Sequence, residues 1–309
     1  MAAGTAVVFP GITPCPYQDV AKFMLLNPVA RRLVSQADEV LGYPLLERYR
    51  AAEGEFSEYA RVAFLVNCLA LAQWAEEALG LRADACVGPS FGGTPAAVHS
   101  GALGFADAVR LTAGWGHRAD AYFAREYGDV VTQSFARVPR ERLAEVRAEL
   151  DEAGEWHEVA CHVDEDFHML SLREHRLDWL RERLRSLGGM PLYTMRPPMH
   201  ARAFAPLREE MERELFRSAD FSAPRIPVVS DHDGRVLESG AEIRTMVLDG
   251  IVRAVEWPTA LSALKGLGVT RLCVAGPDSL WGRVRCVTGN FEVVPVDPQA
   301  ALRRPRLAA

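Results

Sequence analysis

Ser90 lies at the centre of a pentapeptide in which a serine can act as a nucleophile. Residues 88–92 read Gly-Pro-Ser-Phe-Gly, a G-x-S-x-G pattern. In such a pattern the serine stands on a sharp strand-to-helix turn, the glycines let backbone segments approach closely, and the helix N-terminus favours an oxyanion. The apolar residues 83–87 precede it, and the small residues 94–97, which can begin a helix, follow it. This context favours acyl chemistry at Ser90 over a chance match in a Gly-rich loop.

A serine nucleophile needs a base within hydrogen-bond reach, and histidine is the usual one because imidazole titrates near neutral pH. His200 is the preferred candidate among eight histidines, because it follows an expected strand at 192–195 and the rigid Pro197-Pro198 pair. At that point the chain is expected to return to the core domain. The other histidines lie in expected helices, in an expected insertion or in a turn-like segment: His99, His117, His157, His162, His168, His175 and His232. No residue pattern identifies a third member of a triad.

The elements around these residues predict an α/β fold. Strands are expected at 5–10, 83–87, 226–229 and 271–275, and helices at 59–79, 103–127 and 240–252. This alternation is typical of an α/β hydrolase-like core with a parallel sheet. Residues 129–199 instead follow the order β-α-β-β-α-β, which is the ferredoxin-like signature. We therefore expect a large domain, 1–128 and 200–309, with a small ferredoxin-like subdomain inserted at 129–199.

Composition narrows the class of protein. The chain has 309 residues, of which 49% are apolar and 25% charged, as in an ordinary globular enzyme. The first residues lack a secretory pattern and no apolar run approaches a membrane span, so a cytoplasmic protein without membrane partners is expected. Six cysteines without paired spacing argue against a zinc site and against a disulfide scaffold. A net charge of −6 disfavours nucleic acid as a partner.

Several short motifs in a fixed order resemble the malonyl-CoA:acyl carrier protein transacylase family, the acyltransferases of fatty-acid and polyketide synthesis. The matching segments are Phe9-Pro10-Gly11, residues 88–93 around the serine, residues 101–109, Pro198-Met199-His200-Ala201, Val255-Glu256-Trp257 and Gly276-Pro277. The resemblance implies ping-pong acyl transfer, in which Ser90 takes an acyl group from a thioester and His200 serves as its base. It also implies an oxyanion hole formed by the backbone N–H groups of Phe91 and Ile12, and a backbone carbonyl near Gly250 that orients the histidine.

The same resemblance implies acyl carrier proteins as donor and acceptor partners. Carrier proteins are acidic and supply their own phosphopantetheine arm, so no tightly bound cofactor and no metal is expected. Arginines near the cleft could dock such a partner by charge complementarity. The candidates, each of which also suits an ordinary solvated surface, are Arg137, Arg140, Arg202, Arg283 and Arg285.

One departure from the family pattern concerns the substrate. Malonyl-specific members carry an arginine that pairs bidentately with the malonyl carboxylate, and the register places Trp115 at that position. An indole cannot pair with a carboxylate, and burying that charge unpaired costs on the order of several kcal/mol. We therefore expect a non-malonyl acyl group. Two alternatives stay open: a slipped register would make Trp115 a core aromatic, and Arg118, one turn on, could restore carboxylate binding.

The expected acyl pocket also differs from the family pattern at Arg61, Pro89, Gly93 and Met199. The chain most resembles discrete polyketide-pathway acyltransferases that move aminoacyl or dipeptidyl units between carrier proteins in the biosynthesis of macrolactam antibiotics. Arg61 could there meet a carbonyl or carboxylate of a longer acyl group. Two other functions remain open, a hydrolase of the same family that clears acyl groups from carrier proteins and a non-catalytic scaffold that binds them.

Overall fold

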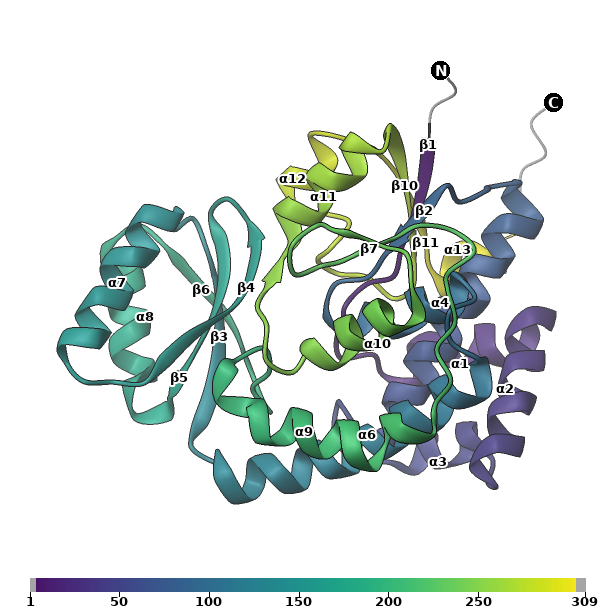
Figure 1. Ribbon diagram of the computed structural model, residues 1–309, viewed down its shortest axis with the longest axis horizontal. Helices are drawn as coiled ribbons and strands as arrows, with labels where there is room; N and C mark the ends of the chain where they lie inside the picture. The colour runs from purple at the N-terminus through teal and green to yellow at the C-terminus, as the bar shows by residue number, and fades with distance from the viewer. Residues whose placement is uncertain (1–3, 304–309) are drawn as a thin grey trace.

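A six-stranded sheet forms the centre of the large domain in the computed structural model, which describes residues 4–303 (Figure 1). The strand order is β11-β10-β1-β2-β7-β8, and all neighbours pair in parallel except β7 and β8. The strands are β1 (Gly4–Val8), β2 (Ala85–Val87), β7 (Val228–Val229), β8 (Val236–Leu237), β10 (Val269–Ala275) and β11 (Glu292–Val296). The predicted α/β core with a parallel sheet is therefore confirmed, with a short antiparallel strand at one edge.

The central strands bring distant loops to one edge of the sheet. β1 and β2 are almost wholly buried because both of their faces are covered, as is usual in parallel sheets. Val8 pairs with Val87, and Val87 pairs with Val229, so the strands β1, β2 and β7 end at the same level. The loops that follow these three strands leave the sheet side by side at its carboxyl edge, where open α/β sheets place their ligands.

Helix α4 (Glu58–Leu79) runs through the core of the large domain. The Ser57 hydroxyl accepts a hydrogen bond from Ala60 N–H at its start, and Gly80, at φ 64°, ends it in the left-handed conformation. The helix is long and apolar enough to cross a membrane, but 67% of its most apolar window is buried inside the protein. The expectation that no apolar run reaches such a length is thus wrong, because this helix is apolar around most of its circumference in order to lie in the core.

Further helices surround the sheet (Figure 1). They are α1 (Tyr17–Leu26), α2 (Pro28–Leu41), α3 (Leu45–Ala51), α5 (Gly93–His99), α6 (Phe105–Glu126), α9 (Ala205–Glu214), α10 (Gly240–Asp249), α11 (Trp257–Gly266), α12 (Arg285–Thr288) and α13 (Pro298–Leu302). Helices α1–α3 were not predicted from the sequence, although α2 carries clear signals. Asn27 caps it by accepting from two backbone N–H groups, Pro28 occupies its first position, and Gly42 ends it in the left-handed conformation.

The small subdomain is an antiparallel sheet with two helices on its outer face (Figure 1). Its elements are β3 (Val130–Ala136), α7 (Arg140–Glu152), β4 (His157–Asp164), β5 (Phe167–Arg173), α8 (Leu177–Ser186) and β6 (Met190–Met195). The strand order β6-β3-β5-β4 is that of a ferredoxin-like unit, as predicted. One strand of the large domain, β9 (Val255–Glu256), pairs in parallel with β4 and extends this sheet. The two domains therefore share a sheet beside the segment that precedes β9.

Candidate active site

Ser90 occupies a strained turn between β2 and helix α5. Its φ is 56°, a left-handed conformation that non-glycine residues rarely adopt. The flanking glycines make the turn possible. A Cβ on Gly88 would lie 1.9 Å from the carbonyl oxygen of Gly92, and a Cβ on Gly92 would lie 2.0 Å from that of Phe9. A single 3-10 turn, Ser90–Gly92, then leads into α5. The predicted strand-to-helix elbow is thus present, and its geometry depends on residues without side chains.

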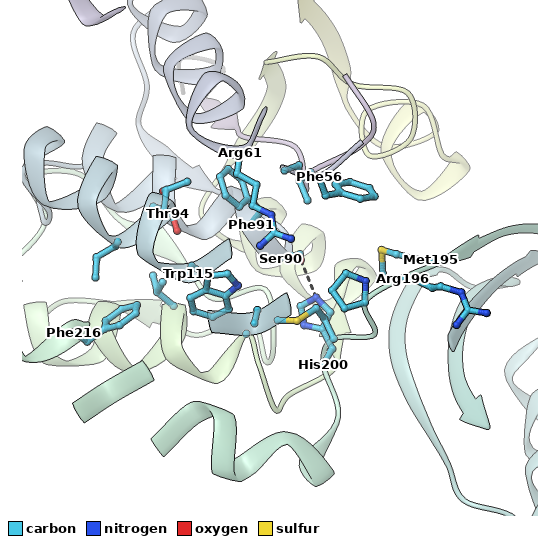
Figure 2. Close-up of a pocket in the computed structure, with 18 residues that line it drawn as sticks. Phe56, Arg61, Ser90, Phe91, Thr94, Trp115, Met195, Arg196, His200 and Phe216 are labelled. Carbon is cyan, nitrogen blue, oxygen red and sulfur yellow. Dashed lines mark hydrogen bonds between the residues drawn. The ribbon is translucent and has the colours of Figure 1, made fainter. Parts of the chain in front are cut away.

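Ser90 and His200 form a hydrogen-bonded dyad (Figure 2). The serine Oγ lies 2.8 Å from His200 Nε2, and His200 Nδ1 lies 3.1 Å from the carbonyl oxygen of Arg253. Because a carbonyl only accepts, Nδ1 carries the proton and Nε2 accepts from the serine hydroxyl. Gly250 was expected to supply this carbonyl, and that expectation is wrong. Helix α10 ends at Asp249 and the chain makes one further turn, so the carbonyl that reaches the imidazole belongs to Arg253.

His200 is held as a neutral base by its surroundings. It is 6% exposed, and its own φ is 64°, so the loop from the small subdomain presents it in a strained conformation. The pKa of His200 is lowered to about 3, mainly by burial and also by the nearby His232. A neutral imidazole with Nδ1 fixed by a carbonyl is the form that can take the proton of a serine hydroxyl.

The two residues predicted to form the oxyanion hole lie at the cavity that holds the dyad. Ile12 and Phe91 both line the cavity at the dyad, and they come from the loops after β1 and β2. Among residues 4–303 neither N–H has a hydrogen-bond acceptor in the protein. Free donors from two loops beside a nucleophile are what an oxyanion hole requires. The predicted pair therefore lines the cavity that holds the dyad, and its role as an oxyanion hole stays a prediction.

An apolar cavity of about 120 Å³ leads away from the dyad into the large domain (Figure 2). Of the predicted substrate residues, Trp115, Arg61 and Met199 line it. Pro89 is not among the lining residues: it is buried below the turn, where its carbonyl accepts from Gly92 N–H. Its expected substrate contact is therefore replaced by a role in shaping the elbow.

Trp115 and Arg61 approach the cavity from different helices. Trp115 of α6 is half-buried on the cavity wall, edge-on to Phe216, so it is not a plain core aromatic. Arg118 is not among the residues lining the cavity and instead donates to the carbonyl of Gly114. Arg61 of α4 is 7% exposed, and its one ion pair among the described residues is a long contact of 3.4 Å to Asp120. The cavity wall thus holds a guanidinium whose donors are largely unused.

The five arginines suggested for docking do not form a single group. Arg140 pairs with Glu256 at 2.9 Å and so ties the small subdomain to β9. Arg202 lies at a second cavity on the other side of His200 rather than at the acyl cavity. Arg137, Arg283 and Arg285 are exposed, and within residues 4–303 they make no ion pair. A docking role for any of them stays a prediction.

The site also contains residues that the sequence analysis did not single out. Phe56 and Arg196 line the cavity near the dyad (Figure 2). Thr112 lines the cavity with a buried hydroxyl that has no hydrogen-bond partner among the described residues. Asp231 accepts from Ser90 N–H at 2.7 Å. Only Thr112 had a usable signal, since it precedes Trp115 by three residues and so shares its helix face.

Known proteins resemble this chain in its small subdomain and along most of its sequence. A family model described as the VinK acyltransferase small domain matches residues 134–195. The malonyl CoA-acyl carrier protein transacylase of Bacillus subtilis strain 168 is 25% identical over 283 residues, covering 88% of this chain and 87% of the relative. The transacylase of the same name from Escherichia coli K12 is 24% identical over 280 residues, covering 88% of each. Over most of its length the chain is thus similar to acyl carrier protein acyltransferases, and it is an acyltransferase.

Solved structures extend the likeness of this acyltransferase to the whole fold. FabD from Acinetobacter baumannii superposes with a TM-score of 0.86 at 18% identity, covering 97% of this chain and 96% of the other. A malonyl transacylase solved in complex with its type II polyketide acyl carrier protein superposes with a TM-score of 0.86 at 19% identity, covering 97% and 98%. Both domains are included, so the inserted subdomain belongs to the shared architecture of the acyltransferase.

Proposed function

We propose that this acyltransferase moves a non-malonyl acyl group, of the aminoacyl or dipeptidyl kind, between acyl carrier protein thioesters through an acyl-Ser90 ester. The observation that carries the proposal is the cavity wall at Trp115. An indole stands there, and the cavity is otherwise mainly apolar. The indole gives a carboxylate seated against it no charged partner in exchange for its lost hydration, which disfavours a malonyl group there, whereas Arg61 on helix α4 can meet an oxygen of a longer acyl group.

The dyad supplies both half-reactions. Ser90 Oγ attacks the thioester carbonyl while His200 Nε2 takes the hydroxyl proton, and the new oxyanion faces the N–H groups of Ile12 and Phe91. The C–S bond then breaks, and the departing sulfur takes the proton from His200. The thiol of a second carrier protein repeats these steps in reverse: His200 accepts its proton, the sulfur attacks the ester carbonyl, and Ser90 leaves as the protonated hydroxyl.

Two polar groups in the cavity support an acyl group that carries amide or similar oxygens. Arg61 brings a nearly buried guanidinium to the wall, and only a long contact to the exposed side chain of Asp120 occupies it. Thr112 adds a buried hydroxyl without a partner among the described residues. A saturated fatty acyl chain would leave both groups unsatisfied, which is costly inside a protein. An amide carbonyl could accept from Arg61, and an amide N–H could donate to Thr112.

Carrier proteins are the proposed partners on both sides of the reaction. A structural neighbour was solved with an acyl carrier protein, and the small-subdomain match is to a model named for an acyltransferase of this kind. Exposed arginines in and just after the small subdomain, Arg137 and Arg202 among them, could meet the acidic surface of such a partner. A role in polyketide or antibiotic biosynthesis and a cytoplasmic location remain predictions.

A panel of acyl thioesters tests the proposal directly. Carrier proteins charged with malonyl, fatty acyl, aminoacyl and dipeptidyl groups are incubated with the enzyme, and intact-protein mass spectrometry follows Ser90 and a second, uncharged carrier. We expect an adduct with the aminoacyl or dipeptidyl groups, passage of that group to the second carrier, and loss of the adduct in Ser90→Ala. Equal loading by malonyl thioesters would overturn the substrate assignment.

Two further outcomes of that experiment separate the alternatives. Release of free acid without gain by the second carrier would identify a hydrolase that works through the same serine. Tight binding of the carriers with no adduct at Ser90 for any member of the panel would identify a non-catalytic scaffold. The Ser90→Ala protein serves as the matched control in both cases, since it keeps the cavity and loses only the nucleophile.

A further inference from the structure

Asp231 and His232 form a buried pair directly behind the nucleophile elbow. They are 3% and 5% exposed and lie in the loop between β7 and β8. Asp231 Oδ2 accepts the backbone N–H of Ser90 at 2.7 Å. This contact joins positions 141 residues apart and reaches the backbone of the nucleophile, which has a strained conformation. The carboxylate is thus placed to hold Ser90 rather than to meet a substrate.

The ring of His232 has a hydrogen-bond acceptor at each nitrogen. Nδ1 lies 3.1 Å from the carbonyl oxygen of Ala254, and Nε2 lies 3.3 Å from that of Met246. Asp231 Oδ1 is a further 3.5 Å neighbour of Nε2. A neutral imidazole would present a lone pair to one of these oxygens, whereas an imidazolium donates to both sides. The geometry therefore suits an imidazolium beside a carboxylate, which is the arrangement in which buried charges are tolerated.

The pair also contacts the segment that orients the catalytic base. Ala254, which accepts from His232, is the neighbour of Arg253, whose carbonyl accepts from His200 Nδ1. The backbone carbonyl of Asp231 accepts from Glu256 N–H at 2.7 Å, at the start of the shared sheet. One loop thus holds the serine through a side chain and the histidine through the 253–256 segment.

We propose that Asp231 and His232 are positioning residues, a buried ion pair that fixes the Ser90 elbow and the His200-orienting segment relative to one another. The inference rests on the dyad and not on the identity of the acyl group. It assigns the pair two effects. Asp231 keeps Ser90 Oγ in line with His200. The positive charge of the nearby His232 lowers the pKa of the catalytic base His200.

Other charged groups face this region and must be considered with it. A second cavity of about 860 Å³ opens on the far side of His200, and His232 lines it too. The charged and titratable residues around it are Arg147, His157, Glu158, His162, Arg202, Arg208, Arg253 and Glu256. Arg208 and Arg253 are already paired with Asp249 and Asp233, and Arg140 faces Glu256. His232 differs from them because it alone contacts both Asp231 and the carbonyl next to Arg253.

The first test replaces Asp231 and measures the rate at which a fluorophosphonate labels Ser90. This reagent reacts with activated serines whatever their acyl specificity, so a wrong substrate assignment would not affect the result. We expect Asp231→Ala to lower the maximal labelling rate about 100-fold with the reagent's apparent affinity unchanged, since a displacement near 1 Å has that effect. Asp231→Asn, which keeps an oxygen acceptor for Ser90 N–H, should recover to within about tenfold of the parent. A folded Asp231→Ala protein that labels at the parent rate would overturn the proposal.

The second test separates the charge of His232 from its packing. In His232→Gln the amide fills similar space without a positive charge, so the acid limb of the labelling rate against pH should move to higher pH. His157→Gln is the matched control, because His157 is also buried beside the second cavity but contacts neither Asp231 nor the 253–256 segment. An acid limb that stays with the parent in His232→Gln, or that moves equally in His157→Gln, would refute the role of the pair.

Discussion

The neighbouring glycines Gly92 and Gly93 give opposite expectations for the same substitution, alanine. A Cβ on Gly92 would lie 2.0 Å from the carbonyl oxygen of Phe9 and 3.1 Å from that of Pro10, both of them backbone atoms. Neither can rotate away, so the turn after Ser90 must shift by about 1 Å or more to restore ordinary contact distances. Such overpacking costs about 1–3 kcal/mol of folding free energy, and a 1 Å displacement at the nucleophile lowers the rate about 100-fold.

Gly93 meets no such obstacle. The nearest atoms to its Cβ would be the terminal methyl of Met246 at 3.3 Å and the carbonyl oxygen of Gly88 at 3.7 Å. The first can move, and the second is an ordinary contact. Gly93 has helical angles, φ −60° and ψ −34°, at the first position of α5, so alanine removes backbone freedom from the unfolded chain without strain. Gly93→Ala should therefore match or exceed the parent stability by up to about 1 kcal/mol.

Thermal unfolding and fluorophosphonate labelling of Ser90 decide between these expectations. For a chain of this size 1 kcal/mol corresponds to roughly 2 °C, so Gly92→Ala should lower the midpoint by about 2–6 °C and slow labelling about 100-fold. Gly93→Ala should do neither. The reasoning fails if Gly92→Ala matches the parent in both measurements, or if Gly93→Ala is impaired as strongly as Gly92→Ala.

Two further residues yield expectations of different kinds. Trp115→Arg should raise the loading of Ser90 by malonyl-CoA, relative to longer acyl thioesters, about 10- to 100-fold, because the carboxylate then gains a charge-assisted pair. Intact-protein mass spectrometry gives the ratio of the two adducts. An unchanged ratio would contradict the argument from the carboxylate. Because burial holds the pKa of His200 near 3, the rate of labelling of Ser90 should fall less than about twofold from pH 7.5 to 5. With a histidine of ordinary pKa as the base, the rate would fall about 30-fold over this range. A labelling rate whose pH dependence has its midpoint near 6.5 would contradict this expectation. At pH values below the ordinary pKa of histidine, His200 takes up a proton in the unfolded chain but not in the folded protein. The free energy of unfolding therefore falls as the pH drops, and His200 accounts for a loss of about 2 kcal/mol at pH 5. Urea unfolding at pH 7.5 and at pH 5 measures this difference.

Local patterns in the sequence were sufficient for the central strands, the elements of the small subdomain and the dyad. The elbow was predictable because its requirements are local: small residues on both sides of one serine, after an apolar strand and before a helix. The ferredoxin-like unit was predictable because its strands and helices follow one another without interruption. His200 could be selected because it follows the last strand of that unit. In each case the deciding signal lay within a few residues of the residue concerned.

Contacts between distant segments could not be predicted in the same way. The carbonyl that orients His200 depends on how far the chain travels after α10, and a miscount of three residues exchanged Gly250 for Arg253. Asp231 is 141 residues from the serine whose N–H it binds, and its neighbours in the sequence suggest only a turn. The pairing of β9 with β4, which fixes the 253–256 segment, joins two domains through strands too short to be recognised alone.

The catalytic residues and the residues that line the acyl cavity come from different elements, which explains how such a site can change its substrate. Ile12, Ser90 and Asp231 follow the strands β1, β2 and β7, whose register the sheet fixes, so the chemistry stands on the most rigid part of the molecule. Arg61 and Trp115 instead project from the helices α4 and α6 into the acyl cavity. A substitution on either helix alters what the cavity accepts without moving the strands that carry the nucleophile. Selection for a new acyl group can therefore act on these two positions while the dyad, its oxyanion donors and the Asp231 contact stay in place.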